Sequence, residues 1–416
     1  MLSRSVLPST KAMISDSVFP SEQPVLRATS FLKALGDPDP SVLGQWLATE
    51  ELHPDLAGWA VAQNLGPYLF QRLQQSAALR STGAVPVQSL PENVRAALLA
   101  ARYQAVAANT IQRQELANIL GALERAEVDV VLLKGTALAY TVYDDPISRL
   151  KGDIDAWMQS DRLPAATSAL ESLGYRSRYK ADRPPALMSL VGGEQQMVNN
   201  IPGTGLIELQ WPAFRGEWTR HTTQIDHAGI WSRCLPITVE GHGTRVMAPE
   251  DTLIHLCHHQ AISHQFSFPW VRGLLDLHLV VERASPDWQK VIAGARVWRL
   301  ATVLWTVFGL SRQLFNTPIP DEVLGALAPA PWRRQAIRGL RLDQMLLEMT
   351  PAGYRRQRFW IQLLLIDRVR DMLRLVGRGL FPEEAWLRAR YGADTPTSLW
   401  RARLLHPLRL VTAGRV

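Results

Sequence analysis

The sequence has little that would suit a secreted or membrane-spanning protein. Its 416 residues include two cysteines, Cys234 and Cys257, too few for a disulfide framework or a four-cysteine zinc site, which favours a reducing compartment. The nearest approach to a long apolar run, Phe359 to Ile366, is far shorter than the roughly 18 residues that suggest a membrane span. The first 23 residues contain serines, Asp16 and prolines in place of an apolar segment, unlike a secretory signal. We therefore expect a cytoplasmic protein.

Lysine is also scarce, with 6 lysines against 39 arginines. Residues 291–416 hold 20 arginines, no lysine and nine acidic residues, whereas the first 290 residues hold 25 bases and 29 acids. This basic C-terminal third fits two interpretations. It could bind nucleic acid, a nucleotide or an acidic peptide, or its arginines could simply cover solvated helix faces, which is the commoner cause of such runs.

The sequence contains no P-loop, dinucleotide fingerprint or serine-histidine-acid order, but two short motifs suggest phosphate chemistry. The apolar run Val130 to Leu133 predicts a buried strand, and Gly135 just after it allows a tight turn and close approach of a ligand. Further on, Asp153 and Asp155 stand two residues apart. On a strand both side chains project from one face while Ile154 points into the core. Two carboxylates placed in this way can hold Mg²⁺ against a triphosphate.

The order of strand, Gly135-Thr136, helix and Asp153-Ile154-Asp155 resembles the nucleotidyltransferase superfamily that includes DNA polymerase beta. Here Thr136 stands where the superfamily has serine, and the hydroxyl is kept. More narrowly, Leu132 to Ala139, Arg149 ahead of the aspartates, and Ile207 to Trp211 resemble the "uncharacterised nucleotidyltransferase" family of bacteria. This resemblance covers roughly residues 98 to 285.

The same resemblance leaves one departure. The third motif of that family usually reads Glu-Leu-His-Trp, whereas Gln210 replaces the histidine here and Glu208 is kept. Any role of that imidazole is therefore absent from this chain.

The resemblance implies an enzyme that uses Mg²⁺ or Mn²⁺ and an NTP such as ATP. Asp153, Asp155 and Glu208 would be the catalytic and metal-binding residues, with Glu208 able to act as general base. Backbone N–H groups at the start of the following helix would bind phosphate oxygens, and nearby cations would neutralise phosphate charge. The predicted nucleotide-binding residues are Lys134, Gly135, Thr136, Arg149 and Lys151.

A second cluster consists of His255, His258, His259 and His264. His255 and His259 have a spacing that can chelate zinc on a helix, although no glutamate follows the first histidine as a zincin requires. The resembling family also has histidines in this helix, which favours a structural or substrate-contacting role. His259, His264 and Asp276 are the candidate substrate contacts, and Asp276 could instead cap a helix or pair with a base such as Arg272.

We expect an α+β fold with a polymerase-beta-like nucleotidyltransferase core, a small mixed sheet with helices. Four regions are predicted: a disordered tail at 1–24, a helical region at 25–126, the catalytic core at 127–240, and an all-helical, arginine-rich region at 241–416. Within the second region, 94–126 would form one long helix or a helical pair. Strands are expected at 128–133, 154–158, 175–179, 195–200 and 206–211, with a hairpin turn at 202–205.

The predicted reaction is transfer of a nucleoside monophosphate to a hydroxyl or phosphate. The resembling family is thought to occur beside toxin–antitoxin-like systems and in gene clusters for ribosomal peptides, including lasso peptides. A peptide, protein or small-molecule acceptor is therefore favoured over a nucleic acid, and the enzyme would serve in peptide modification. Two alternatives stay open: an inactive nucleotide- or RNA-binding regulatory protein, and kinase-like phosphoryl transfer on the same fold.

Overall fold

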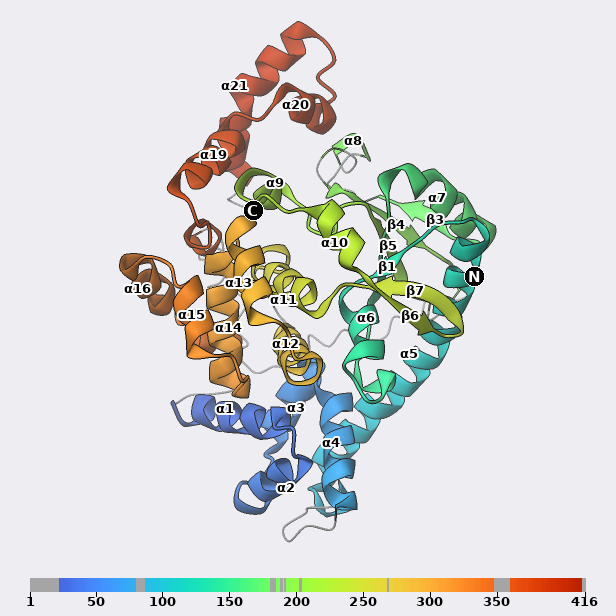
Figure 1. The fold of residues 1–416 in the computed structure, drawn as a ribbon, viewed down its shortest axis with the longest axis vertical. Coiled ribbons are helices and arrows are strands. Elements are labelled where there is room, and N and C mark those ends of the chain that lie inside the picture. The colour runs from blue at the N-terminus through green and yellow to red at the C-terminus, as the bar shows by residue number, and fades with distance from the viewer. Residues whose placement is uncertain are drawn as a thin grey trace.

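The computed structural model describes residues 22–79, 87–179, 185–187, 190, 192–201, 204–267, 269–347 and 360–413. It is an α+β protein in which one mixed sheet lies among many helices (Figure 1). A disordered tail was predicted at 1–24, and residues 1–21 of it lie outside the described residues. Residues 22–24 already belong to the first helix.

The N-terminal region is helical, as predicted. Prolines at the first helical position begin α2 and α3, where a missing N–H costs nothing, and the Asp39 carboxylate caps α2 by accepting from the Ser41 N–H. Residues 92–125 form one helix, α5, and not a pair. The elements are α1 (Glu22–Gly36), α2 (Pro40–Thr49), α3 (Pro54–Ala62), α4 (Gly66–Ala78), η2 (Val87–Ser89) and α5 (Glu92–Arg125).

The sheet has seven strands in the order β3-β4-β5-β2-β1-β7-β6. Its central strands β2 and β5 run parallel, with Asp155 opposite Glu208, and β4 and β5 form the predicted antiparallel pair. Part of the turn expected between those two strands lies outside the described residues. The strands are β1 (Val131–Leu132), β2 (Asp153–Trp157), β3 (Arg176–Arg178), β4 (Glu194–Val198), β5 (Leu206–Gln210), β6 (Leu235–Val239) and β7 (His242–Val246).

Two of these strands, β6 and β7, were not predicted. They form a hairpin around Glu240 and Gly241, and β7 pairs in parallel with β1. The sheet therefore continues to Val246, so the boundary expected at 240 falls inside this hairpin. Pro236 breaks the strand pattern in the sequence, but β6 is an edge strand, where a missing N–H is tolerated.

Short helices surround the sheet. The sequence predicts helices from Thr136 to Tyr143 and from Leu163 to Leu173. In the structure α6 ends two residues earlier, at Thr141, and α7 ends one residue earlier, at Ser172. The short helices are α6 (Lys134–Thr141), η3 (Pro146–Ser148), η4 (Ser160–Arg162), α7 (Leu163–Ser172), α8 (Pro185–Leu187), α9 (Glu217–Thr222) and α10 (His227–Arg233).

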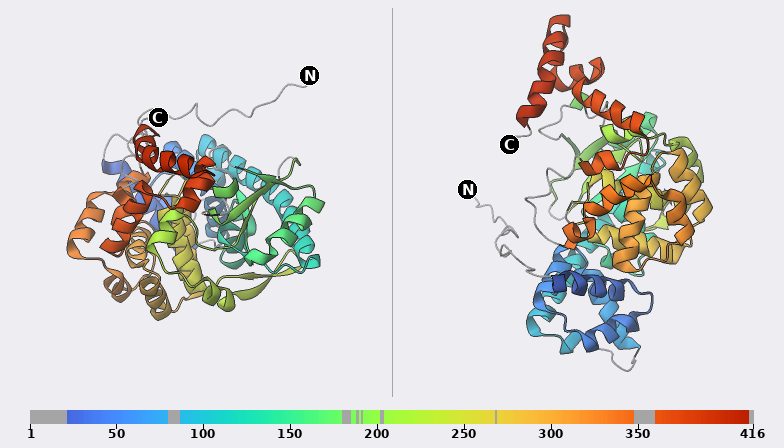
Figure 2. Two further views of the ribbon diagram at one scale, coloured as in Figure 1. Left: turned by 90° about the horizontal axis from the view of Figure 1, so that it is seen from above. Right: turned by 90° about the vertical axis from the view of Figure 1, so that its left-hand side faces the viewer.

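The remainder of the described chain is helical, as expected for the C-terminal region. In Figure 2, α19 to α21 extend from the main body at the end opposite to α1–α4. The elements are α11 (Pro249–His258), η6 (His259–Ser263), α12 (Val271–Ala284), α13 (Trp288–Val297), α14 (Ala301–Phe315), α15 (Asp321–Leu327), α16 (Pro331–Gly339), α17 (Leu342–Leu347), α19 (Val369–Leu380), α20 (Glu384–Tyr391) and α21 (Pro396–Ala413). Within the described residues, no helix is both long and apolar enough to cross a lipid bilayer.

The two faces of the sheet have different roles. Ile154, Ile207 and Leu209 point to the face that α5 and α7 cover, where they join an apolar cluster with Leu120 and Leu170. Because side chains alternate along a strand, Asp153, Asp155 and Glu208 must point to the other face. The apolar face thus fixes the register that brings the carboxylates together.

Candidate active site

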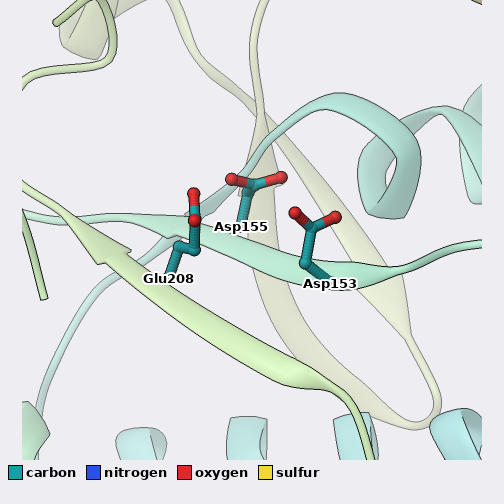
Figure 3. A group of neighbouring side chains, drawn as sticks. All are labelled: Asp153, Asp155 and Glu208. Carbon is teal, nitrogen blue, oxygen red and sulfur yellow. The ribbon is translucent and has the colours of Figure 1, made fainter. Parts of the chain in front are cut away.

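Three carboxylates converge on the polar face of the sheet. Asp153 and Asp155 come from β2 and Glu208 comes from the neighbouring strand β5; Figure 3 shows the three side chains standing on the same side of these strands. One oxygen of each lies within 4.8 Å of the others. Asp155 and Glu208 are buried, and Asp153 is partly exposed. We call these three residues the carboxylate triad.

Asp155 is the most heavily bonded member of the triad. Its Oδ1 atom accepts from Lys134 Nζ at 2.6 Å and from Gln210 Nε2 at 2.6 Å. Lys134 has a left-handed backbone with a φ of +50°, which costs a non-glycine residue about 1–3 kcal/mol. The contacts of its ammonium with Asp155 and, at 4.0 Å, with Glu208 offset this cost.

Glu208 lies among hydrogen-bond donors. Its Oε1 accepts from Gln196 Nε2 at 2.8 Å, and its Oε2 accepts from Arg215 Nη2 at 2.7 Å and from Gln210 Nε2 at 3.3 Å. Burial raises its pKa to about 7, and the charge of Asp155 acts in the same direction. A carboxylate with this pKa can gain and lose a proton near neutral pH.

The two aspartates differ in their electrostatics. Burial, and then repulsion from Asp155, raise the pKa of Asp153 above its ordinary value. Burial would also raise the pKa of Asp155, but the charge and hydrogen bond of Lys134 outweigh it and hold that pKa below the ordinary value. Asp155 is therefore the firmly ionised member of the pair.

The donor set fits a hard divalent cation. All three ligands are carboxylate oxygens, which Mg²⁺ and Mn²⁺ prefer. The repulsion between the carboxylates and the ammonium drawn onto Asp155 both indicate that this place favours positive charge.

A known protein family matches most of the chain that carries this site. The family described as "Uncharacterised nucleotidyltransferase" matches residues 50–316, nearly two thirds of the 416 residues. The chain belongs to this family. The protein is accordingly a transferase, and membership of this family supports transfer of a nucleoside monophosphate.

The chain is similar to the solution structure of the antibiotic-resistance factor ANT(2'')-Ia, with 15% sequence identity and a TM-score of 0.33, over 45% of this chain and 90% of that chain. No curated protein matches the sequence significantly.

The predicted phosphate-binding turn of the nucleotidyltransferase lies beside the triad. Lys134, Gly135 and Thr136 form the first turn of α6, so the N–H groups of Gly135 and Thr136 lie at a positive helix end, as predicted. The Thr136 hydroxyl donates to the Asp153 carbonyl oxygen at 3.3 Å. This bond fastens the start of α6 to the strand that bears the aspartates.

Arg149 and Asp276 form an ion pair, although Arg272 was the partner expected for Asp276. Arg149 Nε and Nη2 donate to Oδ1 and Oδ2 of Asp276, each at 2.7 Å, and the Tyr143 hydroxyl donates to Oδ1 at 2.7 Å. Asp276 is buried, with both oxygens engaged. Its ion-pair partner is Arg149, where Arg272 was expected, and its role as a substrate contact stays a prediction.

Lys151 does not join the triad. Its ammonium lies over the ring of Tyr140, 5.0 Å from the centroid. Burial lowers its pKa to about 8, against the opposing effect of Glu240. The role predicted for Lys151 in phosphate binding stays a prediction.

The histidines divide into two groups. His255 Nε2 donates to the Ala213 carbonyl at 3.1 Å, and His258 Nε2 bonds the Thr219 hydroxyl at 2.7 Å, so both are held in the core. After them, the π-helical turn η6 brings the Nε2 atoms of His259 and His264 to 2.8 Å from each other. Burial, and then the charge of Lys134, lower the pKa values of both.

A zinc site is not supported. Among the residues that the structure describes, the triad is the group of three or more side chains that could hold a metal ion, and no histidine belongs to it. His259 and His264 stay candidate substrate contacts.

Three residues of the site were not predicted: Gln196, Arg215 and Arg272. The sequence carried a signal for the first, because Glu194 and Gln196 are polar residues two apart on one strand, as Glu208 and Gln210 are. Arg215 follows the strand in a loop, and its contact with Glu208 depends on the path of that loop.

Proposed function

We propose that the protein transfers the nucleoside monophosphate of an NTP, with Mg²⁺ or Mn²⁺, to a hydroxyl or phosphate of a peptide, protein or small molecule. The observation that carries this proposal is the convergence of Asp153, Asp155 and Glu208 within 4.8 Å, beside the first turn of α6. We place the reaction in the cytoplasm, where NTPs are abundant.

The protein's own residues would have separate tasks. Asp153, Asp155 and Glu208 would hold the metal, which when bound withdraws charge from the phosphates. The N–H groups of Gly135 and Thr136 would bind phosphate oxygens.

In the proposed reaction an acceptor oxygen forms a bond to the α-phosphorus, and the bond from that phosphorus to the bridging oxygen breaks. Pyrophosphate leaves, and the acceptor proton passes to a carboxylate oxygen of Glu208. The raised pKa of Glu208 suits this task near neutral pH.

The proposed acceptor follows from the gene clusters in which this family is thought to occur. It would be a ribosomal peptide, as in lasso-peptide clusters, or a protein in a toxin–antitoxin-like pair. The test uses each NTP labelled at the α- or the γ-phosphate, with Mg²⁺ or Mn²⁺ and the products of the neighbouring genes. We expect the α-label on the acceptor and none with Asp153→Asn. Transfer of the γ-label would mean a kinase-like reaction, and no transfer from any NTP would favour a regulatory protein.

A further inference from the structure

Two arginines lie side by side next to the phosphate-binding turn. Arg149 Nη1 and Arg272 Nη1 donate to the same atom, the carbonyl oxygen of Leu150, at 2.7 and 2.8 Å. The two guanidinium groups come from distant parts of the chain, one from the loop before β2 and the other from the first turn of α12. Since one carbonyl oxygen accepts from both, two positive charges are held close together.

The charge of Asp276 acts on both arginines, but only Arg149 forms an ion pair with it. Arg149 has the bidentate bond to Asp276. Arg272 forms no ion pair with any acidic side chain in the described part of the chain, and its hydrogen bond to Leu150 is to a neutral group. Burial lowers the pKa of Arg272 to about 10, and repulsion from Arg149 acts in the same direction. A positive charge held in this way favours an anion beside it.

The pair adjoins the predicted phosphate-binding turn. A Cβ atom added at Gly135 would lie 3.0 Å from Arg149 Nη2 and 3.1 Å from Nη1. This guanidinium therefore lies against the first turn of α6. Arg272 shares the Leu150 carbonyl oxygen with Arg149, so its guanidinium group lies near the same turn. An anion bound here would meet α6 N–H groups and two guanidinium groups at once.

We infer that Arg272, with Arg149 and the first turn of α6, binds the terminal phosphate of the NTP. This inference rests on the proposed function and adds a selection to it. A triphosphate would reach the arginine pair with its terminal phosphate while its α-phosphate lies at the triad, whereas a monophosphate at the triad would leave the pair uncontacted. Arg272 thus makes the site selective for triphosphates over monophosphates.

The test measures binding and does not depend on an acceptor. Dissociation constants of ATP, AMP and inorganic tripolyphosphate, each with Mg²⁺, are measured by calorimetry for the wild type, Arg272→Gln and Arg272→Lys. Arg283→Gln is the matched control, because Arg283 lies on the same helix, α12, but pairs with Asp144 at the surface. Melting temperatures without ligand show that each variant is folded.

We expect Arg272→Gln to weaken ATP and tripolyphosphate about 10- to 100-fold, the range for loss of a charge-assisted hydrogen bond, and to change AMP binding little. Arg272→Lys keeps the charge without the planar guanidinium group, so its dissociation constants should lie between those of the wild type and Arg272→Gln. Equal ATP affinity in Arg272→Gln and wild type would overturn the inference while leaving the proposed function standing. An equal loss for AMP would overturn it as well. If the wild type binds neither ATP nor tripolyphosphate, the proposed function fails too.

Discussion

Lys134 determines how the two aspartates of the site differ in their electrostatics. It has an uncommon left-handed backbone, and its ammonium lies 2.6 Å from Asp155. The resulting pair gives the two aspartates different environments. Asp155 has a cation as partner, whereas Asp153 is raised in pKa by burial and by its neighbour. The two aspartates should therefore respond differently to the same substitution.

Replacing either aspartate with asparagine should abolish metal-dependent transfer, because each change removes a ligand charge. Stability should separate them. Asp153→Asn relieves a repulsion and should leave the free energy of unfolding unchanged or up to about 1 kcal/mol higher. Asp155→Asn leaves Lys134 with a more distant carboxylate and should cost about 2 kcal/mol, less than the loss of a fully buried pair. Urea unfolding of both variants without metal measures this difference.

Both urea unfolding and the transfer assay have an outcome that would contradict these expectations. If Asp153→Asn proves less stable than Asp155→Asn, the assignment of the lysine to Asp155 is wrong. Full Mg²⁺-dependent activity in either variant would remove that residue from the mechanism.

Residue identities could be predicted where a local pattern carries them. Asp153, Asp155 and Glu208 follow from alternation on strands and from a family motif, and they do meet in space. Arg149 and Asp276 could not be paired from the sequence, because 127 residues separate them and nothing local joins them. The same holds for Arg272, which no motif marked.

At the scale of elements, α11 and η6 are the segment that carries the histidines. The sequence predicts one helix to about Ser263, whereas the α-helix ends at His258 and a π-helical turn follows. In this turn the His264 N–H bonds the His259 carbonyl at 2.9 Å, five residues back. Such π-turns occur often at functional sites, and here the turn sets His259 against His264.

The strands show why the fold was only partly predictable. Both β4 and β5 were predicted: β5 alternates Ile207 and Leu209 with polar residues, and the turn signal at 202–205 separates it from β4. β6 was missed because Pro236 interrupts its pattern, and its edge position, which makes the proline harmless, is a tertiary fact. β1 is only two residues long, although the apolar run around it predicted six. Its backbone leaves the ladder to begin α6 at Lys134.

The buried histidine His258 predicts a pH dependence of stability. Burial, and then repulsion from His255, lower its pKa to about 3. The folded state therefore keeps it neutral, while the unfolded chain binds a proton below the ordinary pKa of about 6.5. Its contribution is fully present above pH 6.5 and is lost as pH falls toward 3, at up to about 1.4 kcal/mol per pH unit.

We expect His258→Gln to make the free energy of unfolding less dependent on pH between about 6.5 and 4.5. Chemical denaturation across this range measures the slope. His53→Gln is the comparison variant, because the His53 side chain is 55% exposed. A slope unchanged by His258→Gln would show that His258 takes up a proton equally in both states.

At the scale of the whole molecule, the basic C-terminal third now divides into internal and surface charge. Arg299 and Arg333 are buried, and Arg299 pairs with the buried Asp371. On the outer helices, Arg378 and Arg388 pair with glutamates at 3.4 and 2.8 Å. These four arginines are engaged within the fold, which favours the solvated-helix interpretation over a nucleic-acid surface.

We therefore expect weak binding to a generic RNA at low salt. Each neutralised phosphate contributes roughly 0.7 to 0.9 to the slope of log K against log salt, and we expect a slope of about two or less. Filter binding from 50 to 200 mM salt measures it. A slope of about five or more would show an extended RNA surface and revive the regulatory alternative.

The most direct test of the account is metal-linked nucleotide binding by the intact protein. Because the triad carboxylates repel one another and an anionic triphosphate, each NTP should bind poorly alone and tightly with Mg²⁺ or Mn²⁺. At about 100 times its dissociation constant, the nucleotide with metal should stabilise the fold by about 2.7 kcal/mol, a rise of a few degrees in melting temperature. Asp153→Asn should lose this rise. A melting temperature that no NTP moves in the presence of either metal would contradict the account.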